Sequence, residues 1–372
     1  MRILLIVIFL ALLYLSKRKN TLKPYYIALF IYFLFLSLRY MQGTDYIHYY
    51  NCYYAEHNIF EVLKYGFVQT QFDLLYNLMV SIFRTLNIPF SLFIVCINVI
   101  ILILYHRFFK YFSESKILSL LLLYMLYGIV FIESALRQGI AIAILLGICL
   151  PAYKEKNIRD LLLGIIIAFL FHKSSIIFSI TLLTIFYIFV IKKQEVIKIN
   201  KKILFLIFII FLLINFFPYQ MIFSPFASQN DIAFKIVYYF STSRISIFAF
   251  LLRIIYLLFF SYILYYKKIN IMKCGNEIYF LYLMGIFLYF MFFRFSILSR
   301  VTVYFEILEI VIFANFINDN LQIKSKYINI LICLYLLISC VLFVKDGIAT
   351  QTQSNYEKVS IIYPYHHLFE NW

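Results

Sequence analysis

The chain has 372 residues, of which 65% are hydrophobic and only 13% are charged, and its formal net charge is +16. With a mean hydropathy of +0.92, it carries more apolar surface than a soluble core could bury, so the composition excludes a soluble globular protein and predicts a membrane protein with many spans. Its six cysteines stand singly, without a Cys-X-X-Cys pair or a Cys/His metal spacing. We therefore expect no disulfide framework, no metal and no cofactor.

Apolar runs separated by short polar or basic segments predict an all-α polytopic membrane protein, with residues 1–372 forming a single integral membrane domain. The first run lacks a small-residue cleavage site and passes into Lys17, so we expect a retained helix rather than a signal peptide. Twelve transmembrane helices are expected, near 3–15, 25–38, 90–105, 117–131, 134–150, 158–171, 175–191, 203–217, 245–265, 277–293, 301–317 and 327–344.

Basic residues predict the orientation of these helices. Alternate loops, from 16–24 to 318–326, hold 20 of the 33 lysines and arginines and are expected to face the cytoplasm. Both termini then face outward, as do the loops 39–89 and 218–244 and the tail 345–372. A single crossing within 39–89 would invert every later loop, so we predict that its apolar segment 72–86 is an interfacial or re-entrant helix.

The sequence Arg39-Tyr-Met-Gln-Gly43-Thr44-Asp45-Tyr46 directly follows the second predicted helix. In so apolar a chain, the few polar residues are expected to carry the function. Further tyrosines after Tyr46 could stack on sugar rings or could belong to an interfacial aromatic belt. The tail around His366 is rich in aromatic residues like the segment after Tyr46. We expect it to fold back over a cavity on the outer side of the protein.

Four predicted helix starts combine a hydroxyl side chain with a basic one, and together they favour binding of a phosphorylated ligand. Two alternatives remain open: Glu133 and Arg137 are spaced for an ion pair within one helix, and His172 could simply be an interfacial hydrogen bonder. The four starts are Glu133-Ser134-Ala-Leu-Arg137, His172-Lys173-Ser174-Ser175, Ser241-Thr242-Ser243-Arg244 and Ser299-Arg300.

Arginine and lysine differ in their predicted placement. Eight of the eleven arginines fall on the outer side or in outer helix ends. The positive-inside rule explains basic residues on the cytoplasmic side but does not explain arginines on the outer side. Arginine binds phosphate through a planar, permanently charged fork, so this bias favours an anionic ligand. Arg294 and Arg300 bracket a tight outer turn. Glu306 and Glu309 lie deeper and could be functional, or could hold Arg253 or a cytoplasm-side lysine.

At these residues the chain resembles the EpsG family of Wzy-type polysaccharide polymerases. A departure occurs near Asp73, where a Glu-x-Gly type element would be expected, and it leaves the role of Asp73 open. The matching elements are Arg39-x3-Gly43-Thr44-Asp45-Tyr46-x3-Tyr50, Arg137-Gln138, Phe171-His172-x-Ser174-Ser175, Arg300 with Tyr304-Phe305, and Pro364-Tyr365.

The resemblance implies a metal-independent glycosyltransferase, with a multi-helix fold like that of GT-C-type lipid-linked enzymes. It would polymerise undecaprenyl-diphosphate-linked oligosaccharide repeat units on the outer face of the bacterial cytoplasmic membrane. A chain-length regulator and a flippase of the same pathway would be its partners, and no nucleic acid is expected. The implied roles are diphosphate binding for Arg137 and Arg300, donor positioning for Arg39 and Arg294, proton acceptance for Asp45 or His172, and further substrate contacts for Tyr46, Arg244, Tyr304 and His366.

Other functions share some of these features. A ligase that moves finished glycan to another acceptor would use the same outer arginines. A flippase needs charged groups along a path through the bilayer centre, whereas the predicted polar residues gather at one face. A membrane acyltransferase with a catalytic histidine is a further alternative.

Overall fold

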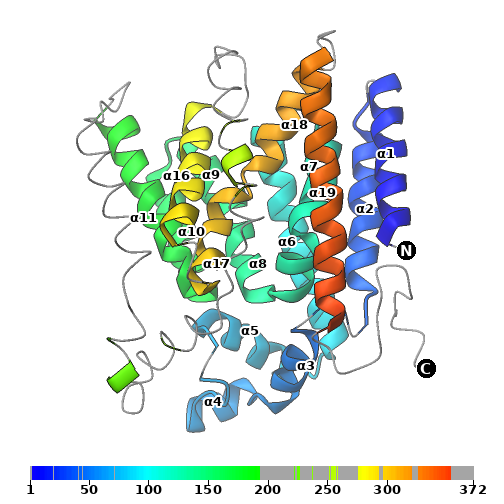
Figure 1. Ribbon diagram of the computed structural model, residues 1–372. Coiled ribbons are helices and arrows are strands. Elements are labelled where there is room, and N and C mark those ends of the chain that lie inside the picture. The colour runs from blue at the N-terminus through cyan, green and yellow to red at the C-terminus, as the bar shows by residue number, and fades with distance from the viewer. Residues whose placement is uncertain are drawn as a thin grey trace. The chain divides into compact units, whose positions relative to one another are not determined.

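The structure is a computed structural model in which every helix or strand assigned to the described residues is a helix (Figure 1). It describes residues 2–19, 21–40, 42–43, 45–70, 72–192, 222, 224–226, 237, 251, 253–256, 258, 275–292, 296–320 and 326–352. The chain divides into two compact units. The first comprises Met1–Ser175 and Ile310–Trp372, and the second comprises Ile176–Glu309.

The first unit contains the N-terminal helices and the two C-terminal ones. Its α-helices are α1 (Arg2–Lys19), α2 (Lys23–Ser37), α3 (Tyr46–Ala55), α4 (Ile59–Tyr65), α5 (Leu74–Thr85), α6 (Phe90–Phe112), α7 (Lys116–Leu123), α8 (Leu136–Ile144), α9 (Leu150–Lys154), α10 (Ile158–Phe171), α18 (Glu309–Asn320) and α19 (Lys326–Thr352). Two π-helices, η1 (Tyr124–Ser134) and η2 (Leu145–Cys149), and one 3₁₀ turn, η3 (Lys173–Ser175), complete it.

Helix α6 shows why the first unit packs as it does. It has 23 mostly apolar and aromatic residues and packs against α2, α8 and η2. The contact with η2 is very close, because a Cβ atom at Gly147 would lie 2.5 Å from the carbonyl oxygen of Leu104. Small residues permit this approach between helices. The neighbouring side chain of Ile103 is 60% exposed, as expected for a side chain that meets lipid.

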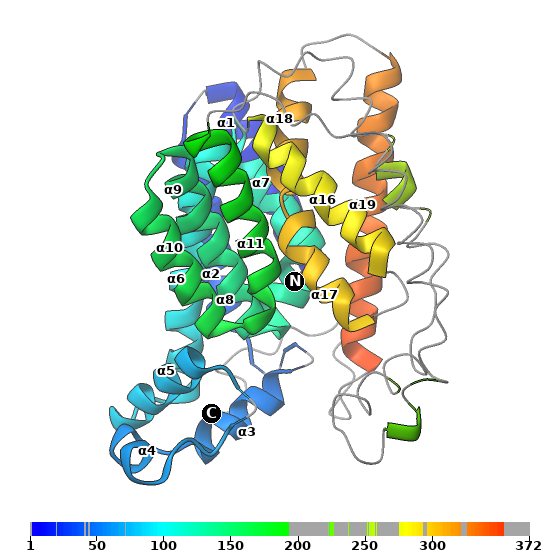
Figure 2. The same cartoon turned by 90° about the vertical axis from the view of Figure 1, so that its left-hand side faces the viewer.

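Helices α3, α4 and α5 lie together at one end of the long helices of the first unit (Figures 1 and 2). They follow the second long helix and precede α6, so they make up most of the segment 39–89. Helix α4 begins with a capping box, in which the Asn58 side chain accepts from the backbone N–H of Glu61 and the Glu61 side chain accepts from the N–H of Asn58. This pattern is visible in the sequence, but a search for apolar runs does not detect it.

The second unit is described in part. Its elements are α11 (Ile176–Ile185), the π-helix η4 (Phe186–Ile191), the 3₁₀ turn η5 (Ser224–Phe226), α16 (Asn276–Phe292) and α17 (Ser296–Glu306). Helices α16 and α17 pack against each other, and both contact α11. The absence of a side chain at Gly285 permits the close packing, because a Cβ atom there would lie 2.4 Å from that of Phe305.

Ten of the twelve predicted apolar helices coincide with helices of the described residues. The helix predicted at 203–217 and most of that at 245–265 lie outside them. Among the described residues, five helical segments are long and apolar enough to cross a membrane: Phe90–Phe112, Lys116–Ser134, Leu136–Lys154, Lys173–Ile191 and Arg300–Asn318. Shorter apolar helices accompany them. These helices indicate a multi-pass membrane protein, and the count of twelve spans stays a prediction.

A buried ion pair joins the beginning of α1 to the end of η1. Arg2 Nη2 lies 2.6 Å from Glu133 Oε2, and the two side chains are 10% and 0% exposed. The Gln42 side-chain oxygen accepts from the same nitrogen at 3.5 Å. The pair therefore links segments 131 residues apart in the sequence.

Replacing Arg2 with Met is expected to destabilise the fold by about 3–5 kcal/mol, because it leaves the Glu133 carboxylate buried without its cation. The double variant Arg2→Met/Glu133→Leu should recover most of this loss, since an apolar pair of similar volume replaces the ion pair. Thermal unfolding in detergent measures both effects. Equal losses in the single and double variants would contradict the pairing.

Candidate functional site

Between α2 and α3, Arg39 and Gly43 lie against the end of η1. Arg39 is only 1% exposed, and its Nη1 donates to the carbonyl oxygen of Ile132 at 3.3 Å. Gly43 has φ +102°, and a Cβ atom there would lie 2.6 Å from the Glu133 carbonyl oxygen and 3.1 Å from Ser134 Oγ. Only glycine fits both the backbone angle and the space. The structure thus brings together the Arg39–Tyr46 sequence and the start of the Arg137 helix.

The junction between η1 and α8 differs from the sequence-based expectation. The hydroxyl of Ser134 lies at the predicted start of the helix that carries Arg137, a position suited to capping, but the N-cap position is Ala135 and no side chain caps the helix. Instead, Ser134 Oγ donates to the Ile129 carbonyl oxygen at 3.0 Å. The reason is the π-helical winding, in which the N–H of Ala135 bonds to Val130 five residues back and not four.

Arg137 and Glu133 do not form the ion pair that their spacing allowed. Glu133 is paired with Arg2, as described above, and Arg137 Nη1 lies 3.2 Å from Asp73 Oδ2. His172 Nδ1 lies 3.2 Å from the same carboxylate oxygen. These three residues, Asp73, Arg137 and His172, are called the Asp73 cluster below. They come from the start of α5, the first turn of α8 and the end of α10.

The Asp73 cluster is shielded on one side and partly open on the other. The Asp73 side chain is 8% exposed, whereas those of Arg137 and His172 are 20% and 24% exposed. An ionised carboxylate only accepts hydrogen bonds, so a neutral imidazole that bonds to one through Nδ1 carries its proton there and has its lone pair on Nε2. The cluster therefore combines a permanent cation with a group that can accept a proton.

Aromatic rings form a wall beside Arg137. Its guanidinium carbon lies 4.3 Å from the centroid of the Phe72 ring, a cation–π contact. The Phe72 ring packs in turn against Tyr49 and Tyr76, with centroids 5.8 Å and 5.5 Å away. Burial raises the pKa of the Tyr49 hydroxyl, although the nearby Arg137 guanidinium opposes this shift. Tyr49 therefore stays neutral, and Arg137 remains a positive charge on an uncharged wall.

The other predicted site residues of the first unit lie at the start of α3. Asp45 occupies the N-cap position and makes no side-chain cap bond. Tyr46 is 3% exposed and packs edge-on against Phe90, with ring centroids 5.3 Å apart. This burial favours a packing role for Tyr46 over sugar stacking.

Other predicted site residues belong to the second unit or lie outside the described residues. Arg300 is exposed and Tyr304 is buried, both on α17. Arg253 Nη2 binds Glu306 Oε2 at 2.9 Å, and Glu309 accepts from the Tyr282 hydroxyl at 3.3 Å. The two deep carboxylates thus have structural partners. Three residues lie outside the described residues: Arg244, Arg294 and His366.

Sequence reasoning left the role of Asp73 open. The residue precedes an apolar helix, which resembles an ordinary capping position, and its partners lie 64 and 99 residues further along the chain. No local pattern connects positions so far apart. The available signal was the rarity of acidic residues in this chain.

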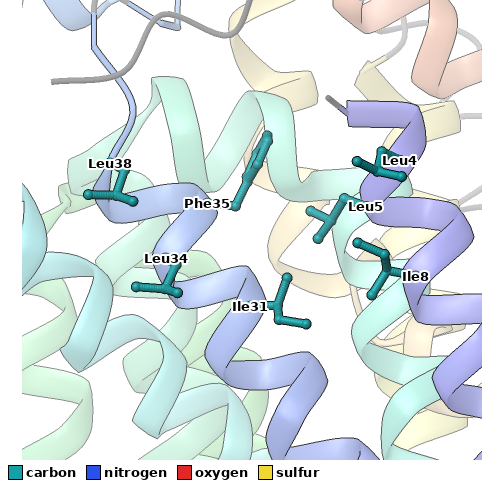
Figure 3. Close-up of a pocket in the computed structure, with 7 residues that line it drawn as sticks. All are labelled: Leu4, Leu5, Ile8, Ile31, Leu34, Phe35 and Leu38. Atoms are coloured by element: carbon teal, nitrogen blue, oxygen red, sulfur yellow. The ribbon is translucent and has the colours of Figure 1, made fainter. Parts of the chain in front are cut away.

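An apolar cavity of about 250 Å³ opens between α1 and α2 (Figure 3). Every residue that lines it is a leucine, an isoleucine or a phenylalanine, and its rim includes Leu38, the neighbour of Arg39. Its surface suits a hydrocarbon chain and offers no group for chemistry. Within the described residues, no group of three or more His, Cys, Asp or Glu side chains is placed to hold a metal ion.

The long apolar helices and the partly open Asp73 cluster define a multi-pass membrane protein with a polar, ion-paired site in its first unit. The chain belongs to the EpsG family, whose sequence model matches residues 22–357. This is a family of membrane proteins that resemble polysaccharide polymerases, and membership indicates a role in polysaccharide biosynthesis. Searches of curated proteins and of solved structures found no match.

Replacing Gly43 with Ala is expected to displace the segment 39–45, because the new methyl group would collide with the Glu133 carbonyl oxygen. Overpacking of this kind costs about 1–3 kcal/mol. Limited trypsin digestion measures the effect, since Arg39 is buried in the native protein and cleavage after it should rise about tenfold or more.

The matched control is Gly66→Ala. Gly66 also has a positive φ, +81°, but nothing lies within 4 Å of a Cβ atom built there. It therefore carries the backbone strain without the collision. Unchanged protection of Arg39 in Gly43→Ala would show that the glycine does not hold the segment against η1.

Proposed function

We propose that this protein polymerises undecaprenyl-diphosphate-linked oligosaccharide repeat units into O-antigen, capsular or exopolysaccharide on the outer face of the bacterial cytoplasmic membrane. Family membership supports polysaccharide synthesis, and the Asp73 cluster is the observation that supports glycosyl transfer. It holds a cation suited to a diphosphate beside an imidazole suited to a hydroxyl proton. We place twelve spans in the bilayer, with both termini and the segment 39–89 outside.

The proposed reaction joins two lipid-linked glycans. A hydroxyl of the acceptor repeat unit attacks the anomeric carbon of the donor chain, a new C–O bond forms, and the bond from that carbon to the lipid diphosphate breaks. The hydroxyl proton passes to a protein base and then to the departing diphosphate or to solvent. Negative charge develops on the leaving group, so cations fixed in a partly dry site lower the barrier most.

Arg137 is assigned to the diphosphate. It lies in the first turn of α8, where the positive end of the helix dipole adds to its charge. The contact with Phe72 holds the guanidinium plane in place while leaving part of it exposed. Arg300 and Arg244 are proposed as further diphosphate or donor contacts, with Arg294, Tyr304 and His366 on the glycan.

His172 is the proposed base. Its contact with Asp73 fixes the ring and stabilises the protonated form that follows proton transfer, as in other carboxylate–histidine pairs. Asp45 remains the alternative base. Arg39 and Tyr46 act from a distance in this proposal, because both are buried and shape the segment that carries Asp45.

The test is deletion of the gene, complemented with the wild-type chain or point variants, with glycan ladder length as the readout. Loss of long chains with retention of single-repeat products is expected. Long chains that persist in the deletion strain would refute the polymerase. Loss of single-repeat products from the cell surface would favour a flippase, and polymer that forms but stays unattached to its final acceptor would favour a ligase.

Arg137→Lys is expected to reduce polymer formation about 100-fold, the scale observed when one fixed donor to transition-state charge is removed. Lysine keeps the charge but loses the planar fork that contacts Asp73 and stacks on Phe72. Arg159→Lys is the matched control, because Arg159 is exposed at the other end of the helix that leads to His172. Full activity of Arg137→Lys, at equal protein level, would argue against direct diphosphate binding.

A further inference from the structure

Asp73 occupies a helix N-cap position but does not use its side chain there. At such a position the carboxylate normally accepts from the backbone N–H groups of its own helix. The Asp73 carboxylate makes no such bond, and its Oδ2 atom meets Arg137 and His172 instead. A local interaction has therefore been exchanged for two long-range ones.

Hydrogen bonds from Glu56 and Asn77 hold the turn that precedes Asp73. Glu56 is 3% exposed, and its two carboxylate oxygens accept from the backbone N–H groups of Val68 and Gln69 at 2.8 Å and 3.0 Å. Asn77 Nδ2 donates to the Gln69 carbonyl oxygen at 2.7 Å. These bonds hold the chain just before Asp73, so the position of its carboxylate is set independently of Arg137 and His172.

We propose that Asp73 is a positioning residue that sets the distance and orientation between the Arg137 guanidinium and the His172 imidazole. This inference rests on the proposed glycosyl transfer, because it assigns the spacing between the leaving-group site and the base. One oxygen atom within 3.2 Å of both donors fixes both side chains at once. Without it, two cationic groups would lie side by side whenever the imidazole is protonated, and they would repel each other.

The test uses purified full-length protein in proteoliposomes, with lipid-linked repeat units as substrate. Asp73→Asn keeps the side-chain shape and removes the charge, and it is expected to lower kcat about 100-fold with little change in KM, as for a small misplacement of catalytic groups. Asp160→Asn is the matched control, because Asp160 makes only local contacts with Asn157 at the start of α10. It should retain the wild-type rate.

A double-mutant cycle separates positioning from a purely structural role. Because Asp73 acts through His172 as well as Arg137, adding Asp73→Asn to His172→Ala should lower the rate clearly less than the about 100-fold expected for Asp73→Asn alone, whereas independent effects would multiply. Multiplying effects, or a wild-type rate in Asp73→Asn, would overturn the proposal. If Asp73→Asn does not accumulate, Asp73→Glu takes its place in the same cycle. The rate of Asp73→Glu should lie between that of the wild type and that expected for Asp73→Asn. This difference from the Asp73→Asn rate should be lost when His172→Ala is also present.

The two proposals fail in different ways. Absence of polymer from the wild-type protein in proteoliposomes would refute the proposed function. A wild-type protein that makes polymer, together with an Asp73→Asn variant of equal rate and stability, would refute only the positioning role.

Discussion

A carboxylate buried in an apolar chain is unstable unless hydrogen-bond donors or a cation meet it, and this constraint organises the protein. Five carboxylates are buried among the described residues: Glu56, Asp73, Glu133, Glu306 and Glu309. Each has donors from another part of the chain, including Arg2 for Glu133 and Arg253 for Glu306. Apolar packing tolerates many arrangements of similar helices, whereas these pairings admit few. The charges therefore select which helices meet.

The junction between η1 and α8 illustrates how these charge pairings build the site. The Arg2–Glu133 pair fixes the end of η1, the segment 39–45 lies on that end through Gly43, and Arg137 follows in the next turn of chain. Asp73 then connects Arg137 to His172 on a third helix. The Asp73 carboxylate is buried and holds its two partners in place. The partly exposed side chains of Arg137 and His172 can reach a substrate.

Hydropathy predicted the positions of most helices, because a span of lipid-soluble residues has few alternatives to a helix. It did not predict α3 or α4, which are polar or short, although the Asn58/Glu61 capping box offered a signal for α4. The sequence singles out the motifs around Arg39, Arg137 and His172 as polar residues in an apolar chain, and their functional roles stay predictions. Their partners were not predicted, since short-range spacing favoured Glu133 for Arg137 while the fold supplied Asp73. Pairings across 64 or more residues leave no trace in a single sequence.

The π-helical winding of η1 has a consequence for how this site can change. A π-helical turn holds more residues than an α-helical turn, so η1 stores extra residues within a nearly unchanged length. Deleting one residue there would return a turn to α-helical winding and keep Glu133 beside Arg2 and beneath Gly43. The same deletion in an α-helix such as α6 would rotate everything beyond it by about 100° around the helix axis. The length of η1 can therefore change by one residue while the site keeps its geometry.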